Sequence, residues 1–331
     1  MKRSVVLFAG LVVMIFCGSW GYLVHRTVNQ LAIYELPKPM TAFFWKNRDY
    51  LVTNAPRPDI RRNTDTTEAP RHFVDIENYG DSAAWKMPLH EEEAIRIYGA
   101  DSLKRNGILP YVIQRVFGEL REAMRARKAD SILYYAADLG HYIGDANVPL
   151  HTSSNFDGQM TGQRGIHSLW ETAVPNMDMN SYRLRDGHKA RYVSDVAVAV
   201  WEAVRHSHSL LDAMFAAEKE ASVGMADTVK YRMVTTKYGK TYKAYSNEFA
   251  KVYDVKMGRM VNDQLLRSAD MIADFWYTAW VDAGKPDLGG LLQTAYTSGD
   301  RKAFKVEWRA YKRNQLIGKG LLKARLQDGA E

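Results

Sequence analysis

Histidine and carboxylate side chains gather in residues 141–151, where His141, Asp145 and His151 stand close together. His141 and Asp145 are four positions apart, so on a helix their side chains share one face, about one turn apart, and can reach a common ion. Pro149 ends such a helix. His151 can therefore approach the same ion from another direction.

A second pair of the same kind follows at His167 and Glu171. Either pair alone is typical of an ordinary helix surface. Together with His151, however, the two pairs supply nitrogen and oxygen ligands and no thiolate within residues 141–171. Zinc takes imidazoles and carboxylates in catalytic sites, where an open position is left for water. The joint pattern therefore predicts a metal centre.

Four further candidate ligands lie upstream, in two places. Asp59 and His72 are joined by a loop rich in Arg, Asp and Thr, and Asp75 is interpreted either as a hydrogen-bond partner of an imidazole or as a surface residue. His25 follows Trp20 by five positions. If the chain begins at Trp20, the free amine and the carbonyl of that residue can chelate a metal beside His25.

Residues 1–19 predict a signal peptide that would leave Trp20 as the new terminus. Two basic residues precede an apolar run from Val5 to Phe16, which is short for a membrane span, and the small Ser19 suits cleavage. We therefore expect an exported protein, periplasmic or extracellular, with a retained anchor as the alternative. Cys17 is the one cysteine, so the exported chain would hold no disulfide.

The elements that must position these ligands read as helices. Apolar residues recur at helical spacing over 111–124 and 132–143, and long helices are predicted over 190–217 and 242–279. No stretch alternates convincingly as a strand. The pattern predicts one all-α domain over residues 20–284, with functional loops between its helices.

Composition places the chain among soluble globular proteins: 46% of its 331 residues are hydrophobic and 25% are charged. These values exclude collagen-like, disordered and multi-span membrane classes. Residues 301–325 carry nine Lys or Arg against the single acid Glu307. We interpret residues 285–331 as a linker and a short basic helical extension, either solvated or lying on an anionic membrane surface.

The ligand pattern resembles that of the trinuclear-zinc phosphoesterases, which join bacterial zinc-dependent phospholipases C to secreted single-strand-specific nucleases. The resemblance implies an all-α fold with three Zn²⁺ ions at the floor of a cleft, where activated water attacks phosphorus. Asp59 would also orient the nucleophile and accept its proton. The implied ligands are Asp59, His72, His141 and Asp145 for the first zinc, His151, His167 and Glu171 for the second, and Trp20 and His25 with a bridging Asp145 for the third.

The sequence indicates less clearly whether the chain belongs to the phospholipase branch or to the nuclease branch. Residues 156–160 lack the Gly-Gly-Asn of the nucleases, and the last ligand is Glu171 where nucleases carry Asp, so a phospholipase C-like phosphodiesterase is favoured. Leu23 and Ile60, however, stand where choline-lipid enzymes carry an acid and an aromatic residue. The alternative is a single-strand-specific endonuclease or 3′-nucleotidase. A non-catalytic zinc protein and a membrane-surface protein are less favoured, and no obligate protein partner is evident.

Overall fold

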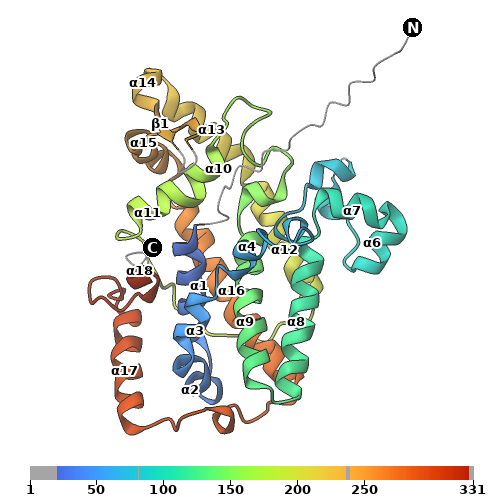
Figure 1. Ribbon diagram of the computed structural model, residues 1–331, viewed down its shortest axis with the longest axis vertical. Coiled ribbons are helices and arrows are strands. Elements are labelled where there is room, and N and C mark those ends of the chain that lie inside the picture. The colour runs from blue at the N-terminus through green and yellow to red at the C-terminus, as the bar shows by residue number, and fades with distance from the viewer. Residues whose placement is uncertain (1–20, 81, 236–238, 328–331) are drawn as a thin grey trace.

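The computed structural model describes residues 21–80, 82–235 and 239–327, and it confirms an all-α fold with one small hairpin (Figure 1). The first half contains α1 (Tyr22–Glu35), α2 (Lys38–Lys46), α3 (Arg48–Thr53), α4 (Arg57–Arg61), η1 (Ala69–His72), η2 (Ile76–Tyr79), α5 (Ala83–Lys86), α6 (Glu91–Tyr98), α7 (Ala100–Asn106), α8 (Leu109–Arg125) and α9 (Ala129–Ala146). The second half contains η3 (Pro149–Thr152), α10 (Ile166–Ser168), η4 (Leu169–Ala173), α11 (Val174–Asp178), α12 (Val196–Ser209), α13 (Leu211–Ser222), α14 (Asp227–Lys230), β1 (Tyr231–Thr235), β2 (Thr241–Tyr245), α15 (Asn247–Met257), α16 (Met260–Asp282), η5 (Gly289–Leu291), α17 (Ser298–Lys312) and α18 (Lys323–Gln327).

Four helices, α1, α8, α9 and α16, pack together as the centre of the molecule (Figure 1). The helices predicted over 111–124 and 132–143 are confirmed as α8 and α9. The whole of α1 after Tyr22 is buried, although it carries polar residues such as His25, Asn29 and Gln30. Polar groups are costly to bury unless they are paired or hold an ion. Asn29 donates a hydrogen bond to the carbonyl of Ala137 and Gln30 donates one to that of Leu321, so both are paired within the core. His25 instead lies beside the buried Asp145.

A glycine lets α1 and α9 approach closely. A Cβ atom on Gly140 would lie 1.8 Å from Oδ1 of Asn29, whose side chain is fully buried. Only a residue without a side chain fits there. This close approach brings His25 on α1 against His141, which follows Gly140 on α9.

The structure corrects the two long helices and the absence of strands. Residues 190–217 are not one helix: α12 begins at Val196, after the N-cap Asp195, and is separated from α13 at Leu210. Residues 242–279 begin in β2, which pairs antiparallel with β1, and a break at Gly258 separates α15 from α16. The hairpin gives no alternating apolar signal because most of its residues on both faces are exposed.

The basic extension contains the helices α17 and α18 and packs against the body beside α1 to α3 (Figure 1). Glu307 of α17 is buried, accepts a hydrogen bond from Nε1 of Trp45 at 2.7 Å and pairs with Arg48 at 3.2 Å. The hydroxyl of Tyr311 donates to Oε1 of Glu35 at 2.8 Å. The extension therefore contributes contacts to the core, while the domain boundary at residue 284 stays a prediction.

Replacing Glu307 with alanine should lower the free energy of unfolding by about 2 to 4 kcal/mol, because the substitution leaves the buried Trp45 N–H and the Arg48 guanidinium without their carboxylate. Chemical denaturation measures the change. Lys302→Ala, on the exposed face of the same helix, is the control and should change stability by no more than about 0.5 kcal/mol. Equal stability of the two variants would show that the extension does not hold the core.

Among the described residues, no helix has both the length and the apolar character needed to cross a membrane. The predicted signal peptide over residues 1–19 and the predicted ligand Trp20 lie outside the described residues.

Candidate metal centre

The structure gathers all eight predicted ligands that it describes, and all eight are buried. They come from seven elements that are scattered along the chain between residues 22 and 173. The ligands and their elements are His25 on α1, Asp59 on α4, His72 on η1, His141 and Asp145 on α9, His151 on η3, His167 on α10 and Glu171 on η4. Their donor atoms form three groups, each able to hold one metal ion.

The first group contains Asp59, His72 and His141. Nε2 of His141 lies 3.1 Å from Nδ1 of His72 and 3.8 Å from Oδ1 of Asp59. The other ring nitrogen of His141, Nδ1, lies 3.0 Å from the carbonyl oxygen of Ala55. A proton on Nδ1 would therefore be donated to Ala55, which leaves the lone pair of Nε2 for the group.

The second group contains His151, His167 and Glu171. The Nε2 atoms of His151 and His167 face each other at 3.3 Å. The Glu171 carboxylate lies 2.9 Å from Nε2 of His167 and 3.1 Å from Nε2 of His151. Nδ1 of His167 is held by the carbonyl oxygen of Phe156 at 3.1 Å. The predicted pairing of His167 with Glu171 across one helical turn is thus present.

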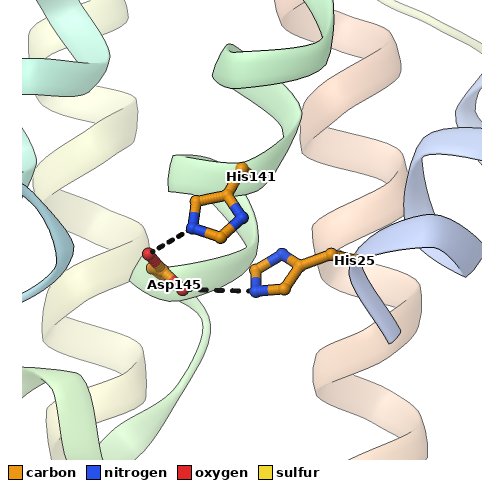
Figure 2. A group of neighbouring side chains, drawn as sticks. All are labelled: His25, His141 and Asp145. Atoms are coloured by element: carbon orange, nitrogen blue, oxygen red, sulfur yellow. Dashed lines mark ion pairs between the residues drawn. The ribbon is translucent and has the colours of Figure 1, made fainter. Parts of the chain in front are cut away.

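The third group contains His25, His141 and Asp145. Figure 2 shows the Asp145 carboxylate beside the two imidazoles and paired with each, with His25 reaching it from α1. Nε2 of His25 lies 3.5 Å from Oδ1 of Asp145, and its ring stacks on that of His141 with centroids 4.0 Å apart.

Asp145 connects all three groups. Its Oδ1 atom lies 3.4 Å from Nδ1 of His151, besides its contact with His25. Its Oδ2 atom lies 2.9 Å from Nδ1 of His72 and 3.3 Å from Nε2 of His141. A carboxylate in this position can serve two cations at once and offset the repulsion between them.

Unpaired buried oxygens show that these residues fit a metal ion. Both carboxylate oxygens of Glu171 and the Oδ2 atom of Asp59 are buried. None of the three has a hydrogen-bond partner within the described part of the chain. Imidazole nitrogens stand within 3.1 Å of the Glu171 oxygens but are not aligned to donate to them. Buried carboxylates need a donor or a cation. Lone pairs that converge without hydrogen bonds are what a bound ion requires.

The comparison with family models then decides the family. The model described as S1/P1 Nuclease matches residues 20–276. The chain belongs to the S1/P1 nuclease family. The resemblance to the phospholipase C and P1 nuclease superfamily is confirmed, and with it a zinc-dependent phosphodiester hydrolase. A comparison with curated proteins finds no match.

The charges in this S1/P1 nuclease centre are set by burial and by the mixture of imidazoles and carboxylates. Burial raises the pKa of Asp145, but His141 and His151 outweigh it and hold the pKa well below its usual range. Burial also raises the pKa of Glu171, but His167 and His151 outweigh this effect, so the pKa lies below its usual value. Both carboxylates are therefore ionised near neutral pH and ready to bind a cation.

His72 requires a proton to leave before a metal enters. Burial lowers its pKa, but hydrogen bonds with Asp145 and Glu68 raise it to about 9. The metal-free imidazole is therefore protonated at pH 7, and zinc must displace that proton. Zinc binding should release at least one proton at pH 7, and the apparent affinity should rise as pH rises towards 9. Calorimetry in buffers of different ionisation enthalpy measures the release, and its absence would contradict the ligation of His72.

Glu68 is a member of the centre that sequence reasoning missed. Its fully buried carboxylate accepts a hydrogen bond from the hydroxyl of Tyr142, pairs with Arg61 at 2.9 Å and lies 3.4 Å from Nε2 of His72. It orients the His72 ring from the side opposite Asp145. Its position four residues before His72 was the available signal. Asp75, by contrast, makes no hydrogen bond with an imidazole of the described chain.

Proposed function

We propose that this phosphodiester hydrolase is a nuclease acting on single-stranded nucleic acid. The family match supports the nuclease branch, whereas residues 156–160 and Glu171 favour the phospholipase branch. The observation that carries the proposal is the position of Phe156, whose ring is 48% exposed and whose centroid lies 6.3 Å from that of His167. An exposed aromatic ring beside a metal ligand offers a stacking surface for an unpaired base.

The loop that carries Phe156 is held firmly. The Asp157 carboxylate accepts backbone N–H groups from Gly165 at 3.0 Å and from His167 at 3.4 Å. The backbone carbonyl oxygen of Phe156 lies within hydrogen-bond distance of Nδ1 of His167. The backbone of Phe156 therefore has a fixed place relative to the second group, which reduces the ordering required when a base stacks on its ring.

A cation stands beside the proposed catalytic carboxylate. Nη1 of Arg62 lies 3.5 Å from Oδ1 of Asp59, and its side chain is 32% exposed. A guanidinium binds phosphate oxygens through two parallel hydrogen bonds. Arg62 can therefore hold the phosphate of the substrate near Asp59.

Each group has a defined part in the proposed reaction. Zinc ions, when bound, lower the pKa of water and neutralise charge on the phosphate oxygens. Asp59 orients the attacking nucleophile and accepts its proton. Burial raises the pKa of Asp59, with His141 and His72 offsetting part of the rise, and a raised pKa suits a group that takes up a proton. Arg62 positions the phosphodiester, and Phe156 stacks the neighbouring base.

A side-by-side assay on three substrates tests the proposal. The zinc-loaded protein should hydrolyse single-stranded DNA or RNA, hydrolyse duplex DNA more slowly because paired bases cannot stack on Phe156, and leave phosphatidylcholine vesicles intact. Mass spectrometry of the products measures each reaction. If the protein hydrolyses the phospholipid and neither nucleic acid, the proposed nuclease activity is wrong and the protein is a phospholipase.

Phe156→Ala should raise KM for single-stranded DNA by about 5- to 150-fold, because stacking contributes about 1 to 3 kcal/mol per base. It should change kcat little, since the ring carries no ligand. Tyr192→Ala is the matched control: Tyr192 is an aromatic residue 51% exposed that neighbours Asp282 at the end of α16. Equal KM values for Phe156→Ala and the control would remove the ring from the substrate site.

We further propose that the centre holds three zinc ions and that the protein is exported after cleavage before Trp20. Gly21, which is bonded to residue 20, donates its backbone N–H to the carbonyl of Glu171 at 3.2 Å, and His25 follows on the same helix. These contacts support ligation by the amine and carbonyl of residue 20. Because the extension is rich in Lys and Arg, we also propose an anionic membrane surface as a partner.

A further inference from the structure

A second group of metal-type side chains lies far along α1 from the catalytic centre. Glu35 is the last residue of α1, ten positions after His25, which corresponds to about 15 Å along the helix. Donor atoms of Glu35, His188 and Asp270 all lie within 4.8 Å of one another. They come from α1, from the irregular segment between α11 and α12, and from α16.

A neighbouring carboxylate orients His188. Its Nε2 atom lies 2.8 Å from Oδ1 of Asp274, which also accepts the backbone N–H of Arg191 at 2.6 Å. Nδ1 of His188 instead faces Oδ2 of Asp270 at 3.9 Å. A metal-bound imidazole typically donates its other N–H to a carboxylate in this way. Nδ1 is therefore the atom presented to the group.

Glu35 aims an unpaired oxygen into the group. The residue is only 5% exposed, and Oε1 accepts a hydrogen bond from the hydroxyl of Tyr311. Oε2 has no hydrogen-bond partner among the described residues, and the same holds for Oδ1 of Asp270. Buried carboxylate oxygens in this state are costly, and a cation would satisfy them.

The charge balance of the group points the same way. Burial raises the pKa of Glu35 to about 8 and that of Asp270 to about 7, with Asp186 adding to the rise at Asp270. His188 lowers the pKa of both carboxylates but offsets only part of the rise. A cavity of about 430 Å³ borders both Asp186 and Asp270 and gives an ion a path from solvent.

We propose that Glu35, His188 and Asp270 bind a divalent transition-metal ion of the zinc class, at a structural site separate from the catalytic centre. One imidazole and two carboxylates form a three-ligand set that zinc accepts, with water or Asp186 completing it, whereas calcium prefers oxygen alone. The ion would tie α1 to α16 and to the segment that carries His188. Through Tyr311 on Glu35 it would also steady α17.

Zinc content per chain tests the site. After reloading with Zn²⁺ and removal of excess metal, His188→Gln and Asp270→Asn should each contain one zinc fewer than the unaltered protein while keeping kcat within about twofold. Asp263→Asn, an exposed acid on the same helix, should keep the full content. Equal zinc in the unaltered protein and both variants would overturn the proposal.

A measurement on the unaltered protein guards against misfolded variants. Crystals grown with Zn²⁺ should show anomalous scattering at the zinc edge between Glu35, His188 and Asp270, apart from the peaks of the catalytic centre. Peaks at the catalytic centre with none at this group would overturn the proposal. Occupation by Ca²⁺ but not by Zn²⁺ would also overturn it, because His188 would then not be a ligand.

Discussion

Asp145→Asn is expected to lower phosphodiester turnover by about a thousandfold or more and to remove more than one zinc from each chain. The carboxylate contacts imidazoles of all three ligand groups, His151 and His25 through Oδ1 and His72 and His141 through Oδ2. An amide replaces one ligating oxygen with an NH₂ group and removes the negative charge that offsets cation repulsion. A metal contribution of several kcal/mol corresponds to this loss in rate.

Two comparisons isolate the role of Asp145. Glu171→Gln should remove zinc from the second group alone, because that carboxylate contacts His151 and His167 only. Asp130→Asn, an exposed acid in the first turn of the same helix α9, should change neither zinc content nor turnover. Full zinc content and normal turnover in Asp145→Asn would contradict the bridging role.

A protein that begins with Met directly before Trp20 is expected to lose one zinc and about a thousandfold in turnover, compared with a protein that begins at Trp20 itself. In the longer form the amine of Trp20 becomes a peptide nitrogen without a usable lone pair. In the shorter form the amine, with an ordinary pKa of about 8, loses its proton to bind the metal. His141 has one free lone pair, on Nε2, which the first group uses because its Nδ1 faces the carbonyl of Ala55. His25 and Asp145 alone would therefore leave the third ion with too few ligands.

Zinc content and kcat/KM of the two purified forms measure this effect. Their folds are compared by thermal unfolding without metal, where no difference is expected because the added methionine lies ahead of the helical body. Equal zinc and equal turnover would mean that residue 20 is not a ligand, and the centre would then hold at most two ions.

Part of the clustering of the candidate ligands was predictable because the spacing within each pair is local. His141 with Asp145, and His167 with Glu171, each follow from one helical turn, and the structure places each pair as expected. The joining of these pairs with His25 and Asp59 depends on contacts between distant segments, which spacing cannot show. For these residues the resemblance to a known family supplied the prediction, and the packing of α1 on α9 through Gly140 supplies the physical reason.

Other features could not be predicted from local patterns. The hydroxyl of Tyr245 at the end of β2 lies near Oε1 of Glu218 on α13 and the carbonyl of Gln163, so contacts with distant segments, rather than an apolar alternation, hold the hairpin on the body. In the sequence, Glu307 is the one acid of a basic helical segment. In the structure it is buried, accepts a hydrogen bond from Trp45 and pairs with Arg48. The same limit applies to the group around Glu35, whose members are separated in sequence by more than any local motif spans.

The central claim is that the buried histidine and carboxylate groups hydrolyse phosphodiesters with zinc. The most direct measurement is the rate of single-stranded DNA hydrolysis by protein stripped with a chelator and then titrated with Zn²⁺, with bound metal counted at each step. The account predicts no hydrolysis by the metal-free protein and a rate that rises with zinc bound until the three groups are filled. Full hydrolysis by metal-free protein, or none of any phosphodiester after full zinc loading, would contradict it.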